Sequence, residues 1–174
     1  MMRNEFFGMG GLRIFALGGL LSGALLLYPG CPLADDGRPE IKKLSVEELR
    51  GIVRENKGKV LVLNFWSTLS SISREEMTFL NILYGTGNNE AFEIIGVNVE
   101  GVEPDVIEPF VEMMHIKYPV FVGGNDIVEA YDLQFVPITF ILGKDGRVRH
   151  KEIGFSEKER PKLKKLVERL SAEG

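Results

Sequence analysis

The sequence predicts an α/β protein in which a mixed β-sheet carries helices on both faces. Strand-like runs alternate with amphipathic helical segments along residues 44–174, the order expected of a largely parallel sheet. Residues 59–65 and 91–99 are mainly apolar runs, typical of strands that are buried on both faces. Residues 137–155 hold two strand-like runs around a Lys-Asp-Gly turn, which predicts an antiparallel hairpin and makes the sheet mixed.

Length and charge limit the classes of function. The chain has 174 residues, which is enough for one domain with some chain to spare at the front. Its formal net charge is -4 at pH 7. Nucleic-acid binding needs a basic patch, so a mildly acidic chain predicts no nucleic-acid partner.

Residues 1–31 differ from the rest of the chain. A short, weakly basic stretch is followed by residues 14–28, which carry no charge, and then by a turn-rich polar segment. This layout is typical of an export signal. The uncharged run is shorter than the roughly 20 residues of a membrane-spanning helix. We expect residues 1–31 to be a signal or anchor that places the following domain outside the cytoplasm, in the cell envelope.

Cys31 is the only cysteine, so the chain cannot form an intramolecular disulfide. Its position after the apolar run resembles that of the lipidated cysteine in bacterial lipoproteins. Gly30 fits that pattern, whereas Tyr28 and Pro29 do not. A lipid anchor at Cys31, an uncleaved anchor and a released form all remain open. Residues 32–43 are polar and rich in turn formers, which predicts a linker.

The domain is expected to begin with a helix over residues 45–56. Ser45 and Glu48 have the spacing of a capping box, in which each side chain binds a backbone N–H of the first turn. Val46, Leu49, Ile52 and Val53 fall on one face. A strand over 59–65 follows directly.

A second helix is expected over residues 71–84, immediately after the first buried strand. Ser70 or Ser71 can cap its first turn, and Ser73 with Glu76 predicts a further capping box. Its apolar side chains fall on one side: Ile72, Phe79, Leu80 and Leu83.

The remaining elements are a strand over 91–99, a helix over 104–115, an extended segment over 118–123, a short helix over 125–132, the closing hairpin and a final helix around 163–170. Pro109 predicts a kink or a break in the helix over 104–115, because proline lacks the N–H that a helix interior needs. Asn125 or Asp126 is the expected N-cap of the short helix. The final helix has apolar residues at helical spacing, namely Leu163, Leu166, Val167 and Leu170.

Two sequence stretches resemble one family. Residues 65–77, FWSTLSSISREEM, resemble the segment FW-A/S-T-W-C-x-x-C-R-x-E of TlpA/ResA-type thioredoxin-like (redoxin) proteins. Residues 130–148, AYDLQFVPITFILGKDGRV, resemble that family's YxVxxxPTTFLIDxxGxI segment. The resemblance covers about 44–170 and implies a thioredoxin-like fold. It also implies an exported, anchored protein that reduces disulfides in apocytochromes or other envelope proteins.

On this pattern the family's two cysteines fall at Ser70 and Ser73. Disulfide exchange needs a thiolate, which the helix N-terminus helps to form, and a second thiol that resolves the mixed disulfide. A serine hydroxyl is too weakly acidic and forms no exchangeable bond to sulfur. We therefore expect no intact catalytic residue and neither disulfide cycling nor peroxidase activity. A serine hydrolase is also excluded, because His115 and His150 are not expected beside Ser70.

The resemblance implies further site residues. Trp66, Val136 and Pro137 are expected to bind an extended peptide, with Pro137 in the cis form. Glu100 follows the second buried strand and is expected near Ser70, either as a residual proton acceptor or as a solvated carboxylate. Nothing in the sequence predicts a metal site or a cofactor.

Two functions remain open, together with a decayed paralogue of purely structural value. The first is a redox-inactive member of the family that binds an envelope protein or peptide at the membrane. The alternative is a thiol-disulfide oxidoreductase of the cytochrome c maturation type in which serines replace the natural cysteines. Leu69 and Thr78 stand where the family often has Trp and Pro, which favours natural divergence over engineering. Whether the natural protein is an enzyme stays open.

Overall fold

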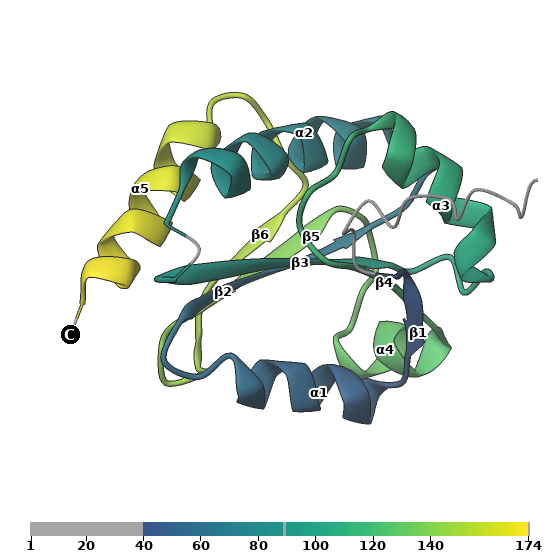
Figure 1. The fold of residues 1–174 in the computed structure, drawn as a ribbon, viewed down its shortest axis with the longest axis horizontal. Helices are drawn as coiled ribbons and strands as arrows, with labels where there is room; N and C mark the ends of the chain where they lie inside the picture. The colour runs from purple at the N-terminus through teal and green to yellow at the C-terminus, as the bar shows by residue number, and fades with distance from the viewer. Residues whose placement is uncertain (1–39, 89, 174) are drawn as a thin grey trace, which may run out of the picture. The chain divides into compact units, whose positions relative to one another are not determined.

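A six-stranded mixed sheet forms the centre of the domain (Figure 1). The computed structural model describes residues 40–88 and 90–173, so the predictions for residues 1–31, for Cys31 and for most of the linker lie outside the described residues. The strands are β1 (Lys42–Leu44), β2 (Val60–Trp66), β3 (Phe92–Asn98), β4 (Val120–Gly123), β5 (Ile138–Leu142) and β6 (Val148–Ile153). Their order is β1-β4-β3-β2-β5-β6. The first four are parallel to their neighbours, whereas β5 and β6 are antiparallel.

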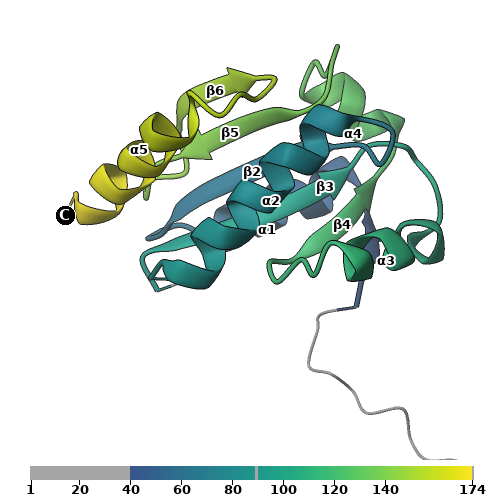
Figure 2. The same ribbon diagram turned by 90° about the horizontal axis from the view of Figure 1, so that it is seen from above.

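Helices cover both faces of this sheet, as predicted. On one face lie α1 (Val46–Glu55) and α4 (Asn125–Ala130), and on the other lie α2 (Ser71–Thr86), α3 (Pro104–Met113) and α5 (Arg160–Ala172) (Figures 1 and 2). A parallel β2–β3 pair needs a crossover, and α2 provides it. The α/β class and the predicted order of helices and strands are confirmed.

The alternation of side chains along β2 divides the interior into two cores. Val60 and Val62 pack with α2, α3 and α5, while Leu61, Leu63 and Phe65 pack with α1 and α4. Every residue of β2 is buried, as expected for a central strand that is covered on both faces. Burying one such large apolar side chain stabilises the fold by about 1.5–3 kcal/mol.

Local details differ from the predictions at four places. The edge strand β1 begins inside the predicted linker and pairs with β4 through its backbone. Helix α3 continues through Pro109, so of the two predicted alternatives the break is wrong. Gly124, and not an Asn or Asp, is the N-cap of α4, because the Asp126 carboxylate instead accepts the backbone N–H of Val46 at 2.7 Å. Ile72 is 44% exposed and lies outside the core.

Candidate functional site

The predicted site residues gather where β2 and β3 end and α2 begins (Figure 1). Strands β2 and β3 are parallel, so the residues that follow them leave the sheet at the same edge. Ligand sites of parallel α/β sheets commonly form at such an edge. We call residues 67–73 together with Glu100, Val136 and Pro137 the α2 site.

Ser70 is the N-cap of α2. Its Oγ accepts the backbone N–H of Ser73 at 3.1 Å, and its C=O accepts the N–H of Arg74 at 3.2 Å. Its own N–H donates to the carbonyl of Ser67, which closes the turn that leads out of β2. The prediction of Ser70 as a cap is confirmed, and its hydroxyl oxygen is held at the helix N-terminus.

Ser73 lies in the first turn of α2 and is fully buried. Its Oγ has no hydrogen-bond partner among the described residues. The predicted capping box between Ser73 and Glu76 is therefore wrong, because the helix begins three residues earlier at Ser70 and both side chains face the interior. The two serine hydroxyls have different surroundings: that of Ser70 caps the helix, and that of Ser73 is enclosed.

Glu76 is the most unusual residue beneath the α2 site. It is fully buried between α2 and the sheet, on the same side of α2 as Leu80 and Leu83. One carboxylate oxygen accepts the amide N–H of Asn64 at 2.9 Å, and the other accepts the hydroxyl of Thr139 at 2.8 Å. Asn64 also donates to the Thr139 hydroxyl at 2.9 Å, so β2, β5 and α2 share one closed polar network.

Burial dominates the electrostatics of this network. It raises the pKa of Glu76 to about 7, although the hydrogen bonds from Thr139 and Asn64 work in the opposite direction. The phenol of Tyr118 is also fully buried, and its pKa is raised by burial and by the negative charge of Glu76. The Tyr118 hydroxyl has no hydrogen-bond partner among the described residues. At neutral pH the Glu76 carboxyl is therefore poised between its protonated and ionised forms.

Glu100 holds the turn in front of α2. Its carboxylate accepts the hydroxyls of Ser67 and Thr68 and the side-chain amide of Asn98, each at 2.8 Å. Burial alone would raise the pKa of Glu100, but these hydrogen bonds outweigh it and the pKa is lowered. The carboxylate of Glu100 therefore holds the turn through three hydrogen bonds.

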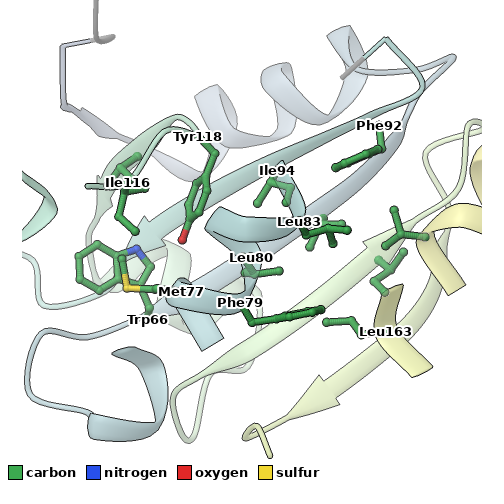
Figure 3. Close-up of a cluster of buried hydrophobic side chains, with 14 of the residues drawn as sticks. Trp66, Met77, Phe79, Leu80, Leu83, Phe92, Ile94, Ile116, Tyr118 and Leu163 are labelled. Carbon is green, nitrogen blue, oxygen red and sulfur yellow. The ribbon is translucent and has the colours of Figure 1, made fainter. Parts of the chain in front are cut away.

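Trp66 is not exposed at the α2 site. The alternation along β2 points it into the core (Figure 3). There it stacks on Phe110 with ring centroids 5.5 Å apart. Figure 3 also shows the sulfur of Met77 beside the indole ring. The predicted direct contact of Trp66 with a peptide is therefore corrected, because this side chain has no exposed surface.

Val136 and Pro137 do lie at the α2 site. Phe65 pairs with Ile138 in the antiparallel β2–β5 ladder, so Pro137 enters the sheet beside the end of β2. The Val136–Pro137 peptide bond is cis. The main chain of Val136 forms no hydrogen bond with any other described backbone group. Phe135, just before it, is 71% exposed, and Leu69, just before Ser70, is 88% exposed.

The Asn64–Glu76–Thr139 network was not predicted from the sequence, although two features of the sequence point to it. Asn64 interrupts a run of apolar residues, and Glu76 falls four residues before Leu80 on the apolar side of α2. A polar residue at a core position needs a partner within the core. Within residues 40–88 and 90–173, no group of three or more His, Cys, Asp or Glu side chains is placed to hold a metal ion. No helix in this part of the chain is long and apolar enough to cross a membrane.

Known proteins are similar to this chain in sequence and in fold. The sequence matches the AhpC/TSA family over residues 36–151. It is 33% identical over 161 residues to the thiol-disulfide oxidoreductase ResA of Bacillus thuringiensis (strain Al Hakam), covering 85% of this chain and 91% of that protein.

Solved structures agree in fold. A thiol:disulfide interchange protein of the thioredoxin family from Chlorobium tepidum TLS superposes with a TM-score of 0.61 at 18% identity, covering 68% of this chain and 84% of that one. StoA from Bacillus subtilis gives a TM-score of 0.55 at 20% identity, covering 63% and 83%. The fold is thus thioredoxin-like, and the chain belongs to the AhpC/TSA family as a TlpA/ResA-type thioredoxin-like protein.

Proposed function

We propose that this protein is an exported, membrane-associated member of its family that binds an extended segment of an envelope protein without exchanging disulfides. The observation that carries the proposal is the pair of serines in the first turn of α2, with Ser70 as the N-cap and Ser73 buried behind it. A helix N-terminus lowers the pKa of a thiol into a useful range. It cannot do the same for an alcohol, so neither side chain supplies a nucleophile for a disulfide.

The exposed apolar side chains around this turn support a binding role. Leu69, Ile72 and Phe135 are exposed on both sides of the serine pair, at the start of α2 and just before β5. Covering one such side chain with a ligand contributes up to about 1.5–3 kcal/mol. The unpaired main chain of Val136 offers one donor and one acceptor for strand-like pairing with a peptide.

The proposed location in the cell envelope is supported by the N-terminal sequence. Residues 14–28 are uncharged and follow a weakly basic start, which is the layout of an export signal. Cys31 follows that run and is a candidate for lipidation. A redox-inactive relative of an oxidoreductase such as ResA would hold its partner in the envelope rather than reduce it.

A binding assay with matched variants tests the proposed function. The probe is a fluorescein-labelled, carboxymethylated insulin B chain, which is an unfolded and thiol-blocked polypeptide, and the readout is fluorescence anisotropy with the full-length protein. We expect micromolar binding that Leu69→Ser combined with Phe135→Ser weakens at least tenfold, about 1.4 kcal/mol.

The matched control removes exposed apolar side chains elsewhere. Ile82→Ser with Met113→Ser changes two residues that are 58% and 65% exposed on α2 and α3, away from the serine pair. We expect this control to bind like the wild type. Equal weakening in both double variants, or no binding at all by the wild type, would contradict the proposal.

A further inference from the structure

A cavity lies on the opposite face of the sheet from α2. It has a volume of about 660 Å³ and is bounded by α1, the end of α4 and the β5–β6 hairpin. In Figure 1, α1 and α4 lie on the side of the sheet away from α2 and α5. We call this cavity the α1 pocket. None of the α2 site residues lines it.

The floor of the α1 pocket is apolar and aromatic. Leu63 of β2 and Phe140 and Leu142 of β5 contribute to it, together with Tyr131 at the end of α4. The rings of Tyr131 and Phe140 pack edge to face with centroids 5.9 Å apart. Small-molecule sites typically enclose about 300–1,000 Å³ with such a lining and a few polar groups that orient the ligand.

The rest of the lining is strongly basic. Arg50, Arg54, Lys57, Arg147 and Lys151 line the pocket. This gathering contrasts with the chain as a whole, whose formal net charge is -4.

Part of this positive charge is neutralised by the protein, because Arg50 forms an ion pair with Glu47. Asp145 is the one acidic residue among the described residues of the lining. Arg149, which is not part of the lining, binds it at 2.9 Å, and Nε of Arg147 lies 3.8 Å from it. Within the described chain, Arg54 and Lys57 form no ion pair, and Lys151 lies 5.1 Å above the ring of Phe140. Like charges that line one cavity repel one another, and an anion placed among them relieves that repulsion.

We propose that the α1 pocket binds a small amphipathic organic anion, with an apolar or aromatic body and a carboxylate or phosphate head. The body would pack on Tyr131 and Phe140, and the head would meet Arg54 and Lys57. An inorganic anion leaves the apolar floor uncovered, and a neutral apolar molecule leaves the cations without a counter-charge. The proposal is independent of peptide binding at the α2 site, because the two sites share no residue.

The test uses the ¹⁵N-labelled full-length protein in a neutral maltoside detergent. The probe is 1-naphthyl phosphate, compared with 1-naphthyl glucoside, which has the same body and a neutral head, and with inorganic phosphate, which has no body. We expect amide shifts in α1 and the β5–β6 turn, with a dissociation constant below about 1 mM for the naphthyl phosphate. Both comparison compounds should bind at least tenfold more weakly. Binding should also weaken as salt rises from 50 to 200 mM, because salt screens the attraction.

Charge-reversal variants assign the effect to the pocket. Arg54→Glu with Lys57→Glu should weaken binding of 1-naphthyl phosphate at least tenfold. Lys164→Glu with Lys165→Glu makes the same change of charge at exposed positions on α5 and should leave binding within twofold of the wild type. No pocket shifts with 1-naphthyl phosphate, equal weakening in both double variants, or equally tight binding of inorganic phosphate would overturn the proposal. If amide shifts in the α1 pocket appear only when the micelles contain phosphatidylglycerol, the basic residues of the lining bind a lipid surface, and the proposal is overturned as well.

Discussion

The buried carboxyl of Glu76 makes a prediction about stability that the structure defines closely. Glu76→Gln keeps the shape of the side chain and removes its titration. In the variant, the amide oxygen can accept the N–H of Asn64. The amide N–H₂ can donate to the hydroxyl of Thr139, which itself donates to Glu76 in the wild type. The substitution therefore tests the charge with little change in packing.

The sign and the size of the effect on the free energy of unfolding follow from the raised pKa of Glu76. Glu76 titrates near pH 7 in the folded protein and near its ordinary value of 4.5 in the unfolded chain. The folded state thus holds its proton more tightly, and the stabilisation is complete below pH 4.5 and is lost as the pH rises through 7. The shift from 4.5 to about 7 corresponds to a loss of roughly 3 kcal/mol of unfolding free energy across that window.

Urea unfolding at half-unit steps between pH 4.5 and pH 8.5 measures this effect. We expect the wild type to lose stability relative to Glu76→Gln as the pH rises, by roughly 3 kcal/mol over the window. The variant should be slightly less stable near pH 4.5 and more stable at pH 8.5, so the two curves cross. The pKa of Glu93 is also raised, chiefly by burial. Its contribution to the pH dependence is the same in both proteins and cancels when one stability curve is subtracted from the other. Parallel curves would refute the assignment of this pH dependence to Glu76.

Substitutions at three further positions separate the roles of neighbouring groups. Ser70→Ala removes the N-cap of α2 and should cost about 1 kcal/mol of unfolding free energy in urea, whereas Ser70→Asp should restore it. Ser73→Ala removes a buried hydroxyl that has no hydrogen-bond partner within residues 40–88 and 90–173, so the same measurement should show no loss or a small gain. Glu100→Ala frees the turn before α2 and should speed amide hydrogen exchange at Thr68 and Leu69, while exchange in β3 should change much less. Equal losses for both serine variants, or unchanged exchange at the turn, would contradict these roles.

Much of the fold could be predicted because local signals agreed with the final packing. The capping box of Ser45 and Glu48 is present at the start of α1, and the continuous apolar runs became the central strands β2 and β3. The edge strand β1 could not be predicted in this way. It has three residues, Lys42–Leu44, that pair through the backbone while two of their side chains stay exposed, so composition carries no signal.

The candidate site was predicted only in part, since side-chain direction depends on tertiary packing. The sequence offered Ser70 as one of two possible N-caps of α2, and Ser70 is the cap. It could not show that Trp66 points into the core, where it stacks on Phe110. The α1 pocket could not be predicted from the sequence for a different reason. Its basic residues come from α1 and from the β5–β6 hairpin, about 100 residues later, and only the folded sheet brings Arg50 and Arg147 to one cavity.

Insulin reduction measures whether the α2 site exchanges disulfides. The full-length protein is mixed with insulin and dithiothreitol, and precipitation of the reduced B chain is followed by turbidity. Cys31→Ala is measured in parallel so that the single thiol cannot contribute, and Ser70→Cys with Ser73→Cys is expected to restore activity. We expect the wild type to add nothing to the rate measured with dithiothreitol alone. Catalysed insulin reduction that persists in Cys31→Ala would show instead that the α2 site is redox-active.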